Sequence, residues 1–445
     1  MNTEFITVFD IISALIWSVL LLIIVGYKKS NNVPETLKPY FIPSYLFRSF
    51  FGILFALAYI FILGGGDTKA YFQGANTLNN LFVKSPLLYL ESMWSDPSSL
   101  LLSKHFDSIT GYPPSWIYKE KEGWFVCKIA SVLSLITFKS YFAMTLIIAY
   151  FSFSSSFRLL SLVEKLKLHS TRNLVFAFLL IPSVGFWCSG LSKDSIILIA
   201  TMYLLWAVFE VLINLNPLKF KNILLILLCV YVIYSIRPFM LMAISAPLFL
   251  SFGTRLTRRF ESNWAIKTLL RSVYVTIGLV SLYFFMSSPY ILTLINEATI
   301  IKDDFTTNDI YTGKKYDIGI VDFSLFGLVK SFPVVVFYGF YRPFITESLT
   351  PTLFLNGIES LIFMFLTLKF FISKNIVKKL KMISKNELLL FALLFAILLS
   401  FIAAFTSVIF GVLVRIRSIL LPFLILILTI NINTNDHQTE TKELE

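Results

Sequence analysis

The chain alternates long apolar runs with short polar connections, and this pattern dominates every other periodicity in the sequence. An apolar helix of about 20 residues spans the ~30 Å hydrocarbon core of a bilayer. The pattern therefore predicts an all-α, polytopic transmembrane helical bundle. Two further stretches, 126–137 and 324–341, are candidate re-entrant or interfacial helices. About eleven membrane helices are expected, at 11–26, 48–65, 136–157, 173–190, 194–213, 222–236, 238–253, 268–287, 350–372, 388–409 and 412–430.

Composition agrees with this class. Hydrophobic residues make up 57% of the chain and charged residues 14%, with a mean hydropathy of +0.78. Soluble globular domains do not have such values, so we expect a single multi-pass membrane domain over 1–445. The first ten residues are acidic, and no small-residue cleavage site follows the first apolar run. That run is therefore predicted to be a retained helix, not a signal peptide.

Lysine and arginine are concentrated in alternate connections, which predicts that these connections are cytoplasmic. The N-terminus is then extracytoplasmic, and the acidic tail 431–445 is cytoplasmic. The net charge of +12 follows from this topology, and nucleic acid is not an expected partner. The basic groups are Lys28, Lys29, Lys38 and Arg48; Lys165, Lys167 and Arg172; Lys219 and Lys221; Arg255, Arg258, Arg259, Lys267 and Arg271; and Lys374, Lys378, Lys379, Lys381 and Lys385.

The same topology places the two longest loops, 66–128 and 288–324, on the outer face. The first has an aromatic, amphipathic texture, which is typical of helices that lie in the membrane interface. The second is polar and is predicted to be a flexible flap. Loops of this length usually have a function of their own.

The stretch GGGDTKAY begins the first of these loops and supplies one candidate catalytic group, Asp67. Glycines let a backbone and a substrate approach closely, and a carboxylate at a helix end avoids the full cost of burial in lipid. Asp67 is thus placed to accept a proton. The alternative is that the glycines only end a helix and that Asp67 is solvated.

The predicted outer face also carries five cations. Short translocated loops are usually poor in lysine and arginine, so these cations need a local explanation. Arginine donors match phosphate in two-point contacts, so these residues predict a phosphate or diphosphate ligand. Asp194 adjoins one of them and could either join the site or cap a helix. The alternative for the whole set is internal pairing with Asp67, Asp194, Glu347 and Glu359. The cations are Lys193, Arg237, Arg342, Arg415 and Arg417.

Cysteine and histidine indicate no metal or redox centre. Cys127, Cys188 and Cys229 lack metal-ligand spacing, and the three histidines are scattered. We expect no cofactor, although the sequence leaves a divalent metal open.

Together, Asp67 with Tyr71 after an early helix, interfacial helices in the first long loop, and arginines on later outer turns resemble bacterial polysaccharide-assembly membrane proteins. These are glycosyltransferases of the GT-C fold and polysaccharide polymerases of the EpsG or Wzy type. The resemblance implies a polyprenyl-(di)phosphate sugar substrate, used at the outer face of a bacterial cytoplasmic membrane. It also implies that Asp67 is a general base, and that Lys193 and the four arginines hold the lipid-linked phosphate.

The chain departs from the GT-C pattern in two ways. An extra helix precedes Asp67, and no paired acids are evident, which favours a polymerase. His105 and Asp107 offer a second candidate base or acid, although a histidine in an aromatic loop is commonly structural. Other polysaccharide-assembly proteins are candidate partners, beside the lipid bilayer itself.

Two alternative functions belong to other classes of membrane protein. A flippase or transporter of a lipid-linked or anionic solute could use the short segments 222–236 and 238–253 as a broken helix pair. It should also carry charge near the middle of the bilayer, where the predicted helix centres are almost uniformly apolar. A structural subunit of an envelope export complex would direct its outer charges at a protein partner. One-sided charge favours chemistry in the membrane interface.

Overall fold

The computed structural model describes residues 6–214, 219–258, 265–266, 268–270, 272–274, 276–278, 300, 315–316, 325–347, 350–407 and 409–431. Every named element within these residues is a helix, and an isolated β-bridge pairs Lys315 with Ile409. The all-α prediction is therefore confirmed. The chain divides into two compact units, Met1–Leu241 and Met242–Glu445, which we describe separately. The prediction of a single membrane domain stays a prediction.

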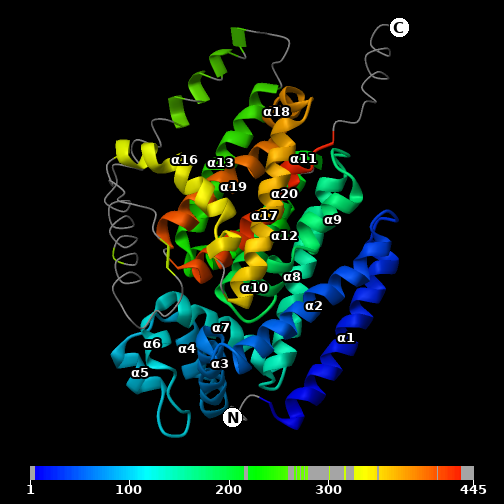
Figure 1. The fold of residues 1–445 in the computed structure, drawn as a ribbon. Helices are drawn as coiled ribbons and strands as arrows, with labels where there is room; N and C mark the ends of the chain where they lie inside the picture. Colours follow the sequence, from blue (N-terminus) through cyan, green and yellow to red (C-terminus); the bar gives the residue numbers. More distant parts are fainter. Residues whose placement is uncertain are drawn as a thin grey trace. The chain divides into compact units, whose positions relative to one another are not determined.

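Seven of the described helices are long and apolar enough to span a bilayer, which indicates a multi-pass membrane protein (Figure 1). Three shorter apolar helical segments are Phe220–Ile236, Pro238–Gly253 and Val329–Tyr341. They belong to α12 (Phe220–Ile236), α13 (Pro238–Arg258) and α16 (Leu325–Tyr341). The expected total of about eleven spans is not confirmed. About half of 268–287 and nearly all of 288–324 and of the tail 431–445 lie outside the described residues. The seven helices are α1 (Val8–Asn32), α2 (Lys38–Phe61), α8 (Tyr141–Glu164), α11 (Lys193–Asn214), α17 (Pro351–Ile372), α19 (Glu387–Thr406) and α20 (Phe410–Leu428).

The predicted span 173–190 is not one helix. It consists of α9 (Thr171–Leu179) and α10 (Pro182–Trp187), with an extended residue, Ile181, between them. Proline has no amide hydrogen and disfavours a helical residue before it, so Pro182 can begin a helix but not continue one. The apolar run is continuous, and the break is set by the proline.

A second correction concerns Arg48, which was expected in a cytoplasmic connection. Helix α2 begins at Lys38, so Arg48 lies inside this helix, and its side chain is fully buried. Its guanidinium donates to the carbonyl oxygens of Phe178 at 2.9 Å and Val184 at 3.0 Å. Phe178 is in the last turn of α9, where carbonyls lack helical partners. Arg48 is therefore an exception to the prediction of almost uniformly apolar helix centres.

The core of the first unit is built around α8, which contacts α1, α2, α9 and α11. Its aromatic side chains pack edge to face against α2. Phe41 lies 5.0 Å from Phe153 and 4.6 Å from Phe157 between ring centroids, within the preferred range for such pairs. This packing holds α2, and therefore the segment that follows it, in a defined position.

The predicted outer loop 66–128 is largely helical. It contains α3 (Gly66–Lys84), α4 (Pro86–Trp94), α5 (Ser99–His105) and α6 (Ser115–Lys119), and it leads into α7 (Lys121–Ile136). Figure 1 shows these helices, in blue and cyan, gathered into one group. The helices are present, and their location in the membrane interface stays a prediction.

Helices α3 and α7 run parallel to each other. Ser131 of α7 donates to Asn79 of α3 at 2.6 Å, and Lys139, just beyond α7, donates to Asn80 at 2.7 Å. Earlier in both helices, Gly74 lies against Cys127, so the contacts advance in the same direction along α3 and α7. As a consequence, the N-terminal ends of α3 and α7 lie on the same side.

The second unit contains α16, α17, α18 (Ile376–Lys385), α19 and α20. Helices α16 and α19 approach closely at Gly339, where an added Cβ would lie 2.2 Å from the carbonyl oxygen of Ser400. The Ser400 hydroxyl donates to the Val336 carbonyl at 2.8 Å. Helices α19 and α20 pack through Phe395 and Phe423, with centroids 5.0 Å apart.

Candidate functional site

The three glycines of GGGDTKAY form the turn between α2 and α3. Gly64, Gly65 and Gly66 have φ values of 69°, 98° and 46°, a region that other residues rarely adopt. The Gly65 amide donates to the Tyr59 carbonyl at 2.6 Å, which folds the turn back onto the end of α2. Helix α3 therefore begins at once, and Asp67 lies half-buried in its first turn. A carboxylate there is stabilised by the helix dipole.

Two ion pairs join the starts of three other helices, α7, α11 and α13. Glu120 is the N-cap residue of α7, and its carboxylate pairs with Lys193, the first residue of α11. Asp194 follows in α11 and pairs with Arg237, with 2.8 Å between Oδ1 and Nη2. Arg237 lies between the end of α12 and the start of α13. The N-terminal ends of α7, α11 and α13 thus meet through two ion pairs.

Tyr71 connects α3 to this cluster. Its side chain is 2% exposed, and burial raises the pKa of its hydroxyl well above the ordinary value. The carboxylates of Asp67, Glu120 and Asp194 raise the pKa of Tyr71 further. The hydroxyl therefore stays protonated and remains a hydrogen-bond donor in the presence of three nearby acids. We call Asp67, Tyr71, Glu120, Lys193, Asp194 and Arg237 the first-unit cluster.

The cations of the first-unit cluster are held by carboxylates. Internal pairing is confirmed for Arg237, because Asp194 is one of the four carboxylates that the alternative named. Lys193 pairs with Glu120, which was not among those four. The pair between Arg237 and Asp194 is the more buried, with 14% and 5% of the two side chains exposed. Within the described part of the chain, Arg237 Nη1 is also buried without a hydrogen-bond partner. A buried donor of this kind is costly unless a ligand or water satisfies it.

The arginines of the second unit have different surroundings. Arg415 and Arg417 were expected in an outer turn, but both lie inside α20, which begins at Phe410. Arg417 is fully buried, and Nη1 donates to the Arg342 carbonyl and to the Ser360 hydroxyl, each at 2.7 Å. Glu359 lies 3.9 Å from Nη2. Arg417 therefore ties α20 to α17 and to the residues after α16.

Arg342 follows α16, as expected, and its guanidinium lies against aromatic rings. The distance to the Tyr338 ring centroid is 3.8 Å and that to the Tyr316 centroid is 5.3 Å. Its Nε lies 3.4 Å from a carboxylate oxygen of Glu347. Internal pairing with Glu347 and Glu359 is thus present for Arg342 and Arg417, as the alternative predicted.

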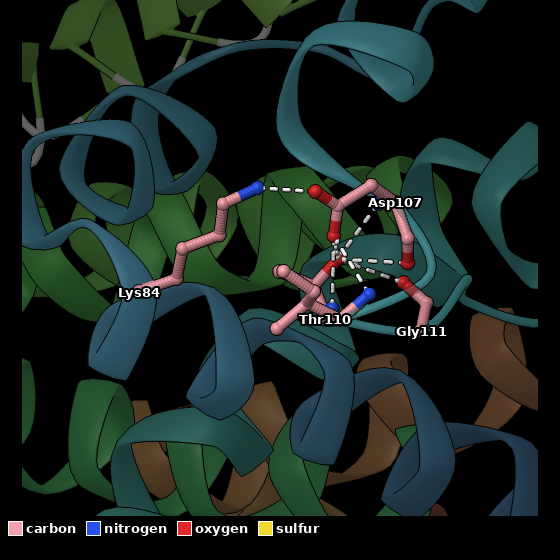
Figure 2. A network of polar contacts seen from close by, with 5 residues as sticks. Lys84, Asp107, Thr110 and Gly111 are labelled. Atoms are coloured by element: carbon pink, nitrogen blue, oxygen red, sulfur yellow. Dashed lines mark hydrogen bonds and ion pairs between the residues drawn. The ribbon is translucent and has the colours of Figure 1, made fainter.

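Asp107 lies far from Asp67. Its Oδ1 accepts hydrogen bonds from the amides of Ile109 and Thr110, each at 3.0 Å, and its other oxygen pairs with Lys84 (Figure 2). The Lys84 hydrogen bond and those from the turn lower the pKa of Asp107 to about 2. Lys84 ends α3 while Asp67 begins it, a separation of about 25 Å along the helix. The geometry gives Asp107 a structural role in a turn.

The side chain of His105 is buried, and it lies next to a residue of the same loop region. It is 2% exposed, and its Nε2 lies 3.6 Å from a carboxylate oxygen of Glu91. Burial lowers the pKa of His105, and the nearby Glu91 only partly opposes this effect. A buried, neutral imidazole against one carboxylate has a packing role here, so we leave His105 and Asp107 out of the first-unit cluster.

Sequence reasoning missed Glu120. It lies in the charged run KEKEG, which resembles a solvated loop, and only the parallel packing of α3 and α7 brings it to Tyr71. No group of three or more metal-ligating side chains occurs among the described residues. The three cysteines are buried thiols, and burial raises the pKa of Cys127.

Comparison with known proteins adds no assignment. The chain matches no protein-family model, no curated protein and no solved structure. A function must therefore be argued from the first-unit cluster and its surroundings alone.

Proposed function

We propose that this protein is a membrane glycosyltransferase or polysaccharide polymerase. It would transfer a sugar or an oligosaccharide from a polyprenyl-(di)phosphate carrier at the outer face of a bacterial cytoplasmic membrane. The single observation that carries the proposal is the first-unit cluster, which brings acids and cations together at one end of several helices. Glycosyl transfer from a phosphate needs a base for the acceptor and positive charge for the leaving group.

Asp67 is the proposed general base. It takes the proton of the acceptor hydroxyl, whose oxygen forms a bond to the anomeric carbon of the donor sugar. The bond from that carbon to the phosphate oxygen breaks, and the polyprenyl (di)phosphate leaves with the electron pair. Tyr71 stays protonated beside Asp67 and can orient it or the acceptor by donating a hydrogen bond.

Lys193 and Arg237 are the proposed phosphate ligands. Both are held in place by carboxylates, Glu120 and Asp194, and the buried Nη1 of Arg237 offers a donor that no described residue uses. A phosphate could accept from this donor without separating Arg237 from Asp194. Arg342 and Arg415 belong to the second unit, and their role as phosphate ligands stays a prediction from the sequence. Arg417 is better explained as a tie between helices, since its Nη1 already donates to protein oxygens.

The proposal includes the predicted topology, with an extracytoplasmic N-terminus and a cytoplasmic C-terminus. The proposed reaction needs no cofactor. Repeating the assay with a chelator tests whether a divalent metal assists. The partners are the bilayer, the polyprenyl-linked substrate and other polysaccharide-assembly proteins.

The test uses the full chain in proteoliposomes. Undecaprenyl diphosphate is the first probe, because it carries the leaving group without requiring knowledge of the sugar. We expect it to raise the melting temperature of the protein, and we expect Arg237→Gln, but not Lys84→Gln, to remove this effect. Polyprenyl-linked oligosaccharides then test transfer by mass spectrometry. No stabilisation by the carrier and no product would overturn the proposal.

A transporter or flippase is the second candidate, and Arg48 favours it. An arginine buried within a candidate span, bonded to carbonyls at a broken helix, is typical of substrate pathways in membrane proteins. In the same proteoliposomes, a flippase would move a fluorescent polyprenyl-phosphate lipid between leaflets without cleaving it. Lipid movement that is lost in the Arg48→Met variant, without any transfer product, would support the flippase function.

A further inference from the structure

The connection between α17 and α19 contains a basic amphipathic helix that the proposed function does not use. Helix α18 spans Ile376–Lys385 and lies between two helices that are long and apolar enough to cross a membrane (Figure 1). It contacts both of them. With so few residues on either side, α18 must lie where the membrane surface begins.

One face of α18 is apolar. Ile376, Leu380 and Ile383 follow the i, i+4, i+7 spacing of a single helix face. Ile383 is 2% exposed and anchors this face in the second unit. Val377 and Leu380, one turn apart, are 75% and 45% exposed, so the protein itself leaves them uncovered. They continue the exposed apolar surface at the end of α17, where Phe371 and Ile372 are uncovered as well.

The opposite face is basic. Lys378, Lys381 and Lys385 recur at i, i+3 and i+7 on the helix, and Lys374 lies in the turn just before it; all four are exposed. No carboxylate occurs between Lys374 and Lys385. Lysine side chains of this kind reach from an apolar helix face to the phosphate level of a bilayer. Charge and shape both match a surface of acidic lipid headgroups.

We propose that α18 lies in the membrane interface and binds acidic phospholipid headgroups through Lys374, Lys378 and Lys381, with Val377 and Leu380 in the acyl region. The lysines of a cytoplasmic loop usually indicate only its topology, whereas here they would form a binding site for lipid. This site would fix the ends of α17 and α19, and it does not rest on the proposed enzymatic function.

The experiment uses a fluorophore on a new cysteine, Val377→Cys, in the full chain. The native cysteines Cys127, Cys188 and Cys229 are buried, so labelling is selective. The protein is reconstituted in nanodiscs of phosphatidylcholine, and a quencher is carried on the headgroup of either phosphatidylglycerol or phosphatidylcholine. The ratio of the two apparent association constants measures the preference for acidic lipid.

We expect phosphatidylglycerol to be preferred, by up to about fivefold for each lysine. The variant Lys374→Gln, Lys378→Gln, Lys381→Gln should bring the ratio close to one. The corresponding three lysine-to-arginine changes should keep it, which shows that loss of preference is not loss of fold. High salt should reduce the preference.

The matched control changes Lys165, Lys167 and Lys221 to glutamine, which alters net charge by the same amount elsewhere. It should leave the preference at position 377 unchanged. Three outcomes would overturn the proposal: no preference in the parent protein, an equal loss in the control, or a fluorophore emission that reports a fully aqueous position.

Discussion

The guanidinium of Arg237 lies 2.8 Å from the carboxylate of Asp194, and this ion pair is largely buried. The two residues are separated by the whole of α12 and by most of α11. Their contact holds the start of α11 next to the turn between α12 and α13. The pair therefore has a structural role, and the Nη1 of Arg237 is a buried donor with no hydrogen-bond partner among the described residues.

Removing one member of this pair should destabilise the protein strongly. Asp194→Asn leaves the Arg237 charge buried without its counterion, which typically costs about 3–5 kcal/mol. Thermal unfolding in detergent, followed by intrinsic fluorescence, measures the loss. The double variant Asp194→Leu, Arg237→Met should recover much of the stability but not the binding of undecaprenyl diphosphate. Full carrier binding by the double variant would exclude Arg237 as a phosphate ligand.

Asp67→Asn should abolish transfer, because asparagine cannot take the acceptor proton. General-base catalysis typically contributes about 10²- to 10⁴-fold. Steady-state rates with a polyprenyl-linked oligosaccharide measure the loss, and binding of the carrier should be unchanged. Asp107→Asn is the matched control, since Asp107 lies at the other end of α3 and should not affect the rate. Equal losses in both variants would indicate a folding defect and not catalysis.

The turn around Asp107 should respond to acid. The pKa of this carboxyl is about 2 in the folded protein, below the ordinary aspartate value of about 3.9. Its stabilising effect is therefore fully present above about pH 4 and is lost as the pH falls through about 2. The protection of the Ile109 and Thr110 amides from exchange, relative to the intrinsic rate at each pH, should fall over this interval. In Asp107→Asn, protection should be low throughout, and a fall in protection over the same interval in this variant would contradict the assignment.

Gly66→Ala should destabilise the turn before Asp67. The residue has a φ of 46°, and the new Cβ would lie 3.1 Å from the Tyr59 ring. A left-handed conformation costs about 1–2 kcal/mol for a residue with a Cβ. The melting temperature should fall, and transfer should fall with it if the turn positions Asp67. Gly26→Ala, with nothing within 4 Å of its new Cβ, is the control and should be tolerated.

Apolar runs predicted several helices closely. The expected spans 350–372 and 388–409 correspond to Pro351–Ile372 and Glu387–Thr406. A membrane helix must satisfy its backbone internally and present apolar side chains over its whole length, so each span has a signal in its own residues. Arg48 lacked such a signal. The apolar run in this part of the sequence starts next to Arg48, so the helix was expected to start there as well. The burial of Arg48 is explained only by its packing against α9 and α10.

The candidate site was predicted in part. Lys193, Asp194 and Arg237 were selected as charges in apolar surroundings, and the structure brings these three together with Tyr71. Glu120 was missed, because a charged loop and a helix start have the same composition. His105 and Asp107 were included on chemical type alone, and their local hydrogen bonds and burial give them other roles.

By itself, the sequence determined that this protein is helical, apolar and multi-pass, because helix formation and transfer into lipid depend on residues that are close along the chain. The tertiary structure decided which charges meet. Glu120 pairs with Lys193, and Asp194 pairs with Arg237, across long stretches of chain. Such pairs depend on how helices pack, and the parallel arrangement of α3 and α7 has no counterpart in the hydropathy of either helix.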